Sequence, residues 1–280
     1  MEAGRGFGYG PAMSNAPSTI GDHLRDWRLR RRMSQMDLAL EADISTRHLS
    51  FLETGRSQPS REMVLRLADR LDIPLRERNI LLVSAGYAPV YSQRSLDDPA
   101  LAAARQAIDL VLRGHEPYPA LAVDRHWSLV AANGALMPLV GTVDPALLKP
   151  PVNVLRLSLH PGGLASRIVN FSEWRDHILT RLHDQVELTA DATLMKLMDE
   201  LRAYPAPSGA SRAPHSRQDY AGVLVPLQLR AEEGVLTLFS TTTVFGTPVD
   251  VTLSELAIEA FFPADPDTAA VLRRMAARVP

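Results

Sequence analysis

The sequence has 280 residues, of which 46% are hydrophobic and 22% are charged, and it contains no cysteine. This composition is typical of a globular protein, and the length is sufficient for two domains that each bury a core. The lack of cysteine excludes disulfides, thiolate metal sites and cysteine nucleophiles. No apolar run approaches the roughly 20 residues that span a bilayer, and residues 1–18 do not resemble a signal peptide. We therefore expect a cytoplasmic protein with no membrane partner.

The net charge is only −2, but the charges are unevenly distributed. Residues 19–90 contain 12 Arg against 10 Asp and Glu, a net charge of +2, whereas residues 91–280 contain 17 Lys and Arg against 21 Asp and Glu, a net charge of −4. The basic residues are densest between positions 28 and 32. Such a run fits either contacts to phosphates or an ordinary solvated helix face.

The first third of the chain is predicted to be helical. Residues 1–18 lack periodicity and are expected to form a flexible tail. Residues 19–90 are expected to form an all-α domain, in which Ser34, Ser45 and Ser60 are candidate N-caps. The five expected helices lie near residues 19–32, 35–42, 46–53, 60–72 and 75–85.

Residues 91–118 are predicted to form a helical linker. Within it, residues 97–114 have apolar side chains at helical spacing. Two roles are open for this helix, because it would serve equally to connect two domains or to pair with a second subunit.

The last part of the chain, residues 119–280, combines strands with helices. Ser172 and Asp191 are candidate helix caps, residues 231–234 are typical of a hairpin turn, and residues 205–218 are expected to be a loop. This pattern predicts an α+β domain with about five strands, divided two and three. The expected strands are 120–123, 128–132, 222–230, 235–243 and 255–262, and the expected helices are 136–140, short pieces within 152–168, 172–188, 193–204 and 266–277.

The segment from Gln35 to Glu53 is the most informative in the chain. Two helices that cross through a tight turn need a small residue where they touch, and Ala39 supplies it. The turn needs a residue that tolerates positive φ, and Asp43 is of that kind. The remaining constrained positions face the core and are all apolar, namely Leu38, Ala42, Ile44, Leu49 and Leu52. The pattern therefore predicts a helix-turn-helix.

With these residues, positions 19–85 resemble the lambda-repressor-like (XRE-family) helix-turn-helix domain, including Ser34-Gln35 and the segment 52–56. The resemblance implies that the third helix lies in the major groove of double-stranded DNA. It also implies that Glu53 pairs with Arg28 of the first helix. Carried over by position, the base readers would be Thr46, Arg47 and Ser50 beside Ser45 and His48, and the phosphate contacts would come from Gln35 and Arg56.

Residues 119–280 resemble a PAS-type sensor, and with the first domain they resemble regulators that carry an MmyB-like ligand-binding domain. The motifs that carry this resemblance include residues 124–127, 160–164, 173–174 and 261–265. It implies a five-stranded antiparallel sheet with inserted helices and an apolar pocket for a small hydrophobic ligand such as a fatty acid. The expected lining residues are Trp127, Phe171, Trp174, Ile178, Leu182, Phe239 and Phe245, with His177 and Arg181 placed to meet a carboxylate.

Each of these ligand-binding residues has a simpler interpretation, because apolar side chains at helical spacing most often belong to the core and the two cations are equally compatible with exposure. No motif for a catalytic nucleophile, a phosphate loop or a metal site is present, so we expect no enzymatic activity and no cofactor beyond a bound lipid. The sequence predicts a homodimeric, ligand-responsive transcription regulator. The alternative is a DNA-binding regulator whose C-terminal domain is a ligand-free dimerisation or protein-interaction module.

Overall fold

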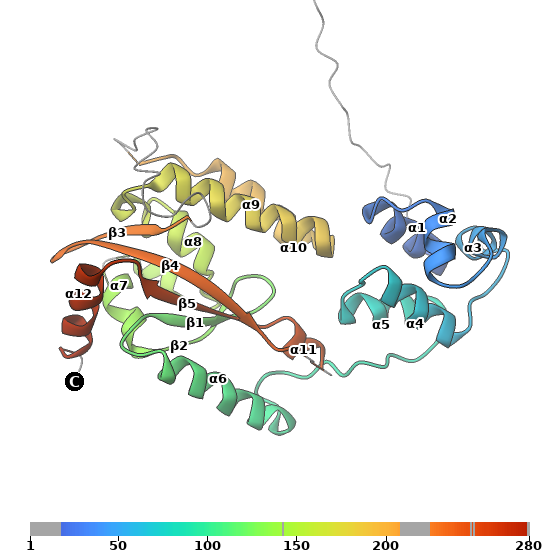
Figure 1. The fold of residues 1–280 in the computed structure, drawn as a ribbon, viewed down its shortest axis with the longest axis horizontal. Coiled ribbons are helices and arrows are strands. Elements are labelled where there is room, and N and C mark those ends of the chain that lie inside the picture. The colour runs from blue at the N-terminus through green and yellow to red at the C-terminus, as the bar shows by residue number, and fades with distance from the viewer. Residues whose placement is uncertain (1–17, 142, 208–224, 247, 249, 279–280) are drawn as a thin grey trace, which may run out of the picture. The chain divides into compact units, whose positions relative to one another are not determined.

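The computed structural model describes residues 18–141, 143–207, 225–246, 248 and 250–278. The chain divides into two compact units, residues 1–90 and residues 91–280 (Figure 1). The tail predicted for residues 1–18 lies outside the described residues except for Ser18, and so does most of the predicted loop at 205–218.

The described part of the first unit consists of five α-helices. The side chains of Thr19, Ser34, Ser45 and Ser60 each accept a hydrogen bond from the first turn of the following helix, which satisfies a backbone N–H that has no partner within the helix. The five predicted helices and the three predicted serine caps are confirmed. The helices are α1 Ile20–Arg30, α2 Gln35–Glu41, α3 Thr46–Glu53, α4 Arg61–Arg70 and α5 Leu75–Ser84.

These helices surround a single apolar core. Every helix contributes at least one leucine with almost no exposed surface, and burial of such side chains is the main favourable contribution to folding. Ala39 and Ala42, on the helix that faces α3, are also buried, which allows the two backbones to approach closely. The buried leucines include Leu24, Leu38, Leu49, Leu52, Leu67, Leu81 and Leu82.

The second unit is built on a five-stranded antiparallel sheet with the order β2-β1-β5-β4-β3 among the described residues. The order places β5, the last strand in the chain, at the centre of the sheet. β3 and β4 form the predicted hairpin, in which Ala231 pairs with Gly234, so the predicted two-plus-three division is confirmed. The strands are β1 Ala120–Val123, β2 Leu129–Ala132, β3 Leu227–Ala231, β4 Gly234–Val244 and β5 Ala257–Pro263.

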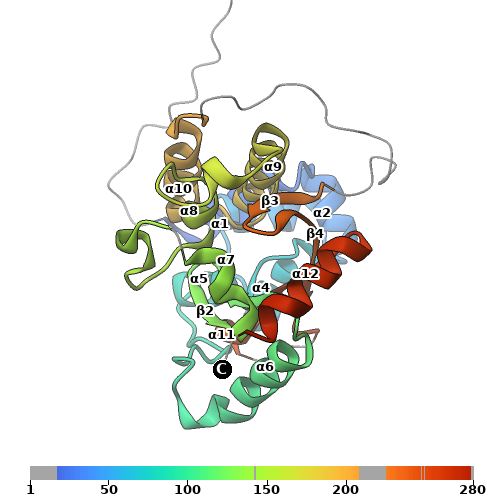
Figure 2. The same ribbon diagram turned by 90° about the vertical axis from the view of Figure 1, so that its left-hand side faces the viewer.

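Helices cover both faces of this sheet, as the two views in Figures 1 and 2 show. On one face, side chains of α8, α9 and α10 pack with those of β3 and β4 in the larger core. On the other face, α6 (Ala102–Gly114) buries Ile108 and Leu112 against Ala122 of β1 and Ile258 of β5. The helices inserted along the chain are α7 Met137–Val140, α8 Val154–Leu159, α9 Phe171–Thr189, α10 Ala192–Ala203, α11 Val251–Ser254 and α12 Pro266–Ala276.

Helix α6 corresponds to the helix predicted at 97–114. It lies within the second unit and packs on the sheet, so this face of the helix is occupied by its own domain. Its other face exposes Leu110, which is 71% exposed, and Val111. The residues before it, 99–101, form a turn of 3-10 helix capped by Asp98.

Two details differ from the prediction. Helix α9 begins one residue earlier than predicted, so Asn170 rather than Ser172 is its N-cap, and no side chain caps it. The predicted cap at Asp191 is confirmed, since its carboxylate accepts from the backbone of Thr193. Helix α11 had no counterpart in the prediction because its four residues are too few to establish a helical period. Among the described residues, none of the helices is both long and apolar enough to cross a membrane.

Candidate functional site

The turn between α2 and α3 has the geometry that the sequence predicts for crossed helices. Asp43 adopts a φ of 54°, the left-handed conformation that a tight turn requires and that Asp tolerates better than most residues. Ala39 is 2% exposed at the contact between the helices. Leu49 is fully buried and Ile44 packs partly buried on the same core.

The outer face of α3 presents the predicted DNA-binding side chains to solvent. Thr46, Arg47 and His48 are exposed, and Ser50 is half-buried. The Ser45 hydroxyl is exposed but engaged, because it accepts a hydrogen bond from the His48 backbone N–H at 3.1 Å. The first turn of α3 therefore carries three exposed polar side chains on a helix whose other face is fixed in the core.

A buried ion pair fixes the end of α3 to α1, as predicted. The Arg28 guanidinium donates to both oxygens of Glu53, with Nε–Oε1 at 2.6 Å and Nη2–Oε2 at 2.9 Å. Gln35 Nε2 donates to Glu53 Oε2 at 2.8 Å. Burial raises the pKa of the Glu53 carboxyl, but the hydrogen bonds from Arg28 and Gln35 and the charges of Arg28 and Arg25 outweigh it, so the pKa lies below its usual value.

Other arginines of the first unit differ in their surroundings, since some bond to protein atoms and others are exposed. Arg31 donates to the carbonyls of Leu71 and Asp72, at 2.8 and 3.0 Å, and so closes the end of α4. Arg30 and Arg56 are exposed, and Arg56 lies over the Phe51 ring with 5.9 Å between the guanidinium carbon and the ring centroid. The basic run at 28–32 is therefore partly structural, since Arg28 and Arg31 both bond to protein atoms.

The second unit contains an apolar cavity of about 110 Å³ between the sheet and the helices that cover it. Its walls come from β1, β3, β4 and β5 on one side and from α7, α8 and α9 on the other. Such a lining favours a ligand that is itself apolar over most of its surface. The apolar walls include Leu121, Leu139, Leu155, Leu157, Leu227, Leu229, Leu238 and Phe261.

Four of the nine predicted ligand-binding residues line this cavity. Trp174, Ile178 and Arg181 recur at helical spacing along α9 and face it together, and Trp127 reaches it from the turn after β1. These four residues line the cavity, and their role in ligand binding stays a prediction.

The other five predicted residues lie elsewhere. Phe171 and Leu182 are enclosed by core neighbours. Phe239 and Phe245 belong with the opposite side of the sheet, where Phe239 stacks on Phe262 at 5.3 Å between centroids and Phe245 packs on the core formed by α6. His177 is half-buried with its ring 5.4 Å from that of Trp174, and burial and the charge of Arg181 lower its pKa.

The polar end of the cavity is formed by Arg181 and three side chains around it. Arg181 Nη2 donates to Glu259 Oε1 at 2.8 Å and to Thr242 Oγ1 at 3.0 Å, and Nη1 lies 3.4 Å from Glu259 Oε2. The Thr242 hydroxyl donates to the same carboxylate at 2.8 Å. The guanidinium also lies over the Trp127 ring, 5.0 Å from its centroid, a favourable cation–π distance.

Glu259 lines the cavity but is not among the predicted ligand-binding residues. It lies on the central strand β5, opposite Thr242 of β4 and Leu121 of β1, and its side chain is only 5% exposed. The alternation of β5 does predict that Glu259 and Ile258 face opposite sides, but the sequence gives no sign that a helix covers the Glu259 side as well. A carboxylate in the middle of an otherwise apolar strand was the available signal.

The turn after β1 positions Trp127 at the cavity. Asp124 Oδ1 accepts from the backbone N–H groups of His126 and Ser128 at 2.9 and 2.8 Å, and Trp127 adopts a φ of 65°. This left-handed conformation is strained for an aromatic residue. The indole Nε1 donates to Gln185 Oε1 at 2.8 Å, so α9 holds the strained residue in place.

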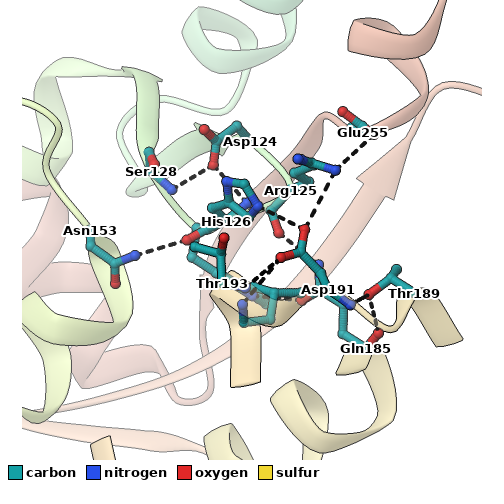
Figure 3. A network of polar contacts seen from close by, with 12 residues as sticks. Asp124, Arg125, His126, Ser128, Asn153, Gln185, Thr189, Asp191, Thr193 and Glu255 are labelled. Carbon is teal, nitrogen blue, oxygen red and sulfur yellow. Dashed lines mark hydrogen bonds and ion pairs between the residues drawn. The ribbon is translucent and has the colours of Figure 1, made fainter. Parts of the chain in front are cut away.

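A network of charged groups joins this turn to the start of α10 (Figure 3). The His126 ring lies 2.8 Å from Asp191 Oδ2, and Arg125 Nη1 lies 3.4 Å from the same oxygen and 3.7 Å from Glu255. Burial raises the pKa of Asp191, but hydrogen bonds from His126 and the Thr193 backbone and the charges of His126 and Arg125 lower it to a value below the usual one. The Asp191 carboxylate thus caps α10 and also contacts both His126 and Arg125 of the turn.

Two family profiles match the chain. The profile described as a helix-turn-helix domain matches residues 19–81, which include α1 to α4 and most of α5. The profile described as the MmyB-like transcription regulator ligand binding domain matches residues 104–275, which include the whole sheet and the cavity. No curated protein matches the chain significantly.

Proposed function

The chain belongs to the MmyB-like transcription regulators, with a helix-turn-helix domain before the ligand-binding domain, and from this premise we propose that α3 reads a specific DNA sequence under control of a ligand in the cavity. The observation that carries the proposal is the exposed first turn of α3 on a helix whose opposite face is fixed by the core and by the Arg28–Glu53 ion pair. A helix presented in this way fits the major groove, where the base pairs are distinguishable.

On this proposal the side chains of α3 have separate roles. Arg47 donates two hydrogen bonds to a guanine, a contact that discriminates against other bases by about 1–3 kcal/mol. Thr46, His48 and Ser50 contact neighbouring base edges, with Ser45 at the groove edge. Gln35 uses one amide N–H for Glu53 and has a second N–H for a phosphate. Arg56 supplies another phosphate contact.

The ligand of the second unit is proposed to be a small molecule with an acyl chain, of the fatty-acid type that the sequence resemblance implies. The apolar walls support this class, and the Trp127–Arg181 end supplies a place for a polar head. The presence of a cavity favours ligand sensing over the alternative of a ligand-free interaction module, since protein interiors are otherwise close-packed.

We further propose that two copies of the chain bind a pseudo-palindromic operator in the cytoplasm. A dimeric helix-turn-helix protein contacts half-sites about one helical turn of DNA apart, roughly 34–36 Å. A ligand that binds one arrangement of the dimer more tightly than another shifts the population toward that arrangement and so changes the affinity for the operator.

The DNA-binding part is tested by electrophoretic mobility shift with DNA from upstream of the protein's own gene, at several salt concentrations. The wild-type chain is expected to prefer one fragment over random DNA of equal length, and Arg47→Ala is expected to lose that preference while keeping nonspecific, salt-dependent binding. Arg70→Ala, which removes an exposed arginine of α4, is the control for charge and should behave as wild type. Equal binding of wild type and Arg47→Ala to every fragment would end the proposal.

The ligand-binding part is tested by mass spectrometry of the natively purified chain. A co-purifying lipid is expected in the wild type and a smaller amount in Val154→Phe, because a larger side chain on the cavity wall fills the space. Val235→Phe makes the same change at a half-exposed surface position of β4 and should leave the lipid content unchanged. A wild-type protein free of lipid that also takes up none on incubation would contradict this part.

A further inference from the structure

We propose that the cavity accepts an acyl ligand with an uncharged head, such as an alcohol, an ester, an amide or a protonated acid, and that Glu259 determines this preference. The inference rests on the proposed ligand-sensing function and specifies the chemistry of its ligand. On this inference the ligand has the acyl chain of a fatty acid but an uncharged head. The site rejects the ionised carboxylate of a free fatty acid.

The positive charge at the polar end of the cavity is already neutralised by the protein. Glu259 receives two contacts from the Arg181 guanidinium, at 2.8 and 3.4 Å, and a third from the Thr242 hydroxyl at 2.8 Å. The Glu259 side chain is 5% exposed, whereas that of Arg181 is 31% exposed. Arg181 was predicted to meet a carboxylate of the ligand. In the structure it meets the carboxylate of Glu259, which belongs to the domain itself.

An ionised carboxylate on the ligand would have to compete with Glu259 for the same guanidinium. Displacing Glu259 would leave a buried anion with Thr242 as its remaining donor among the described residues, which is costly because a buried charge needs a partner. Keeping Glu259 in place would bring two carboxylates together, which is also unfavourable. Both routes penalise an anionic head, and a cationic head would meet Arg181.

A neutral head avoids these penalties and finds hydrogen-bonding groups. A guanidinium has five N–H donors, and three contacts from Arg181 are directed at Glu259 and Thr242. Ser240 lies two residues before Thr242 on the same face of β4 and lines the cavity with its hydroxyl-bearing side chain. A hydroxyl or carbonyl placed between Arg181 and Ser240 would be satisfied without disturbing the ion pair.

An adjoining polar cavity does not supply the missing positive charge. It shares Trp127, Arg181 and Glu259 with the apolar cavity, and its further charged residues are Asp124, Arg125 and Glu255. These two arginines and three acidic residues leave this end of the site with one more negative than positive charge. Its surroundings therefore do not favour an anionic head either.

The inference is tested by calorimetric titration of the delipidated full-length chain with dodecanol and with dodecanoate at about pH 8, where the free acid is ionised. The wild type is expected to bind dodecanol at least tenfold more tightly. Glu259→Gln removes the negative charge and leaves the positive charge of Arg181 unpaired. This variant is therefore expected to reverse the preference and to bind dodecanoate tenfold or more tightly than dodecanol. Glu255→Gln changes a carboxylate of the adjoining cavity that lies beside Arg125 and is expected to keep the wild-type preference.

A wild-type preference for dodecanoate, or equal affinity for both ligands, would overturn the inference while the ligand-sensing function stands. If neither ligand binds the wild type, the ligand-sensing function itself is overturned and the inference with it. The test does not depend on the variant being folded, because the affinities of the wild type for methyl dodecanoate and dodecylamine can be compared with those for dodecanol and dodecanoate. The ester is expected to bind like the alcohol, and an amine that binds more tightly than either would contradict the inference.

Discussion

Each of the two units contains a buried glutamate paired with an arginine, and the two pairs have different surroundings. In the first unit, Arg28 and Glu53 have side chains 9% and 2% exposed and lie in a closed core. In the second unit, Glu259 is equally buried, but Arg181 is 31% exposed and both residues border cavities. The same interaction thus stabilises a helix in one unit and forms the polar end of a site in the other.

The space around each ion pair, rather than the pair itself, indicates its role. An ion pair that is enclosed by a packed core has no space beside it for a ligand. The Arg28 guanidinium, which also donates to the Met33 carbonyl at 2.9 Å, is enclosed in this way, since its side chain is 9% exposed. Arg181 instead presents one side of its guanidinium to Trp127 and to the cavity.

The largest expected effect comes from breaking the Arg28–Glu53 ion pair in the core of the first unit. Arg28→Ala leaves Glu53 buried without its charge partner, and we expect the first unit to lose about 3–5 kcal/mol of unfolding free energy. Urea unfolding of the full-length chain, followed by hydrogen exchange of peptides from residues 19–85, measures this loss in the correct unit. Arg25→Ala, at an exposed position of α1, should have little effect. A similar loss in both variants would contradict a specific role for the pair.

The matching substitution in the second unit removes the arginine of the other ion pair. Arg181→Ala is expected to destabilise its unit by less, about 1–3 kcal/mol, because Glu259 keeps the Thr242 hydrogen bond and also borders the adjoining polar cavity, which has space for water. Hydrogen exchange of peptides from β4 and β5 reports this change. A loss as large as that of Arg28→Ala would show that the second pair is as structural as the first.

Much of the first unit could be predicted because its constraints are local. The positions of Ala39 and Asp43 follow from a motif of a few turns, and the structure contains both. The pairing of Arg28 with Glu53 was implied by the family resemblance, and the structure contains it too. The same holds in the second unit for the helical spacing of Trp174 and Ile178, which line the cavity.

The rest of the second site depends on strand register, which spacing alone does not determine. Phe239 was assigned to the pocket, yet a strand residue changes face with every step, and the pairing of Phe239 with Phe262 puts it on the α6 side. Glu259 meets Arg181 only because β5 is inserted between β1 and β4. Neither the face on which Phe239 lies nor the contact between Glu259 and Arg181 can be predicted from a few neighbouring residues.

The pH dependence of stability is expected to differ between wild type and a His177 variant. Burial and the charge of Arg181 lower the pKa of His177 from the usual 6.5, although Glu259 and Glu173 oppose this. The unfolded state then binds a proton more readily, so the contribution to stability is complete above about pH 6.5 and is lost as the pH falls toward the lower folded-state pKa.

Urea midpoints at about pH 8 and pH 5.5 measure this effect. Wild type is expected to lose more stability at the lower pH than His177→Gln, which carries no titratable group at this position. An identical pH dependence in both proteins would contradict burial of a neutral imidazole beside Trp174.

The smallest expected effect concerns the turn of the helix-turn-helix. Asp43 has a φ of 54°, so Asp43→Gly is expected to raise the unfolding free energy of the first unit by less than about 1 kcal/mol, whereas Asp43→Val lowers it by about 1–2 kcal/mol. Urea unfolding measures whether each variant raises or lowers the unfolding free energy. A stabilised Val variant would be incompatible with a left-handed turn residue.

DNA reading by α3 can be tested by selection of binding sites from random double-stranded DNA with the wild-type chain and with Arg47→Ala. Wild type is expected to enrich one symmetric motif with half-sites about one helical turn apart, and Arg47→Ala is expected to lose the preference for guanine at one position of each half-site. No enriched motif with wild type, or the same motif with the same base preferences in both proteins, would contradict the claim that the exposed face of α3 reads DNA.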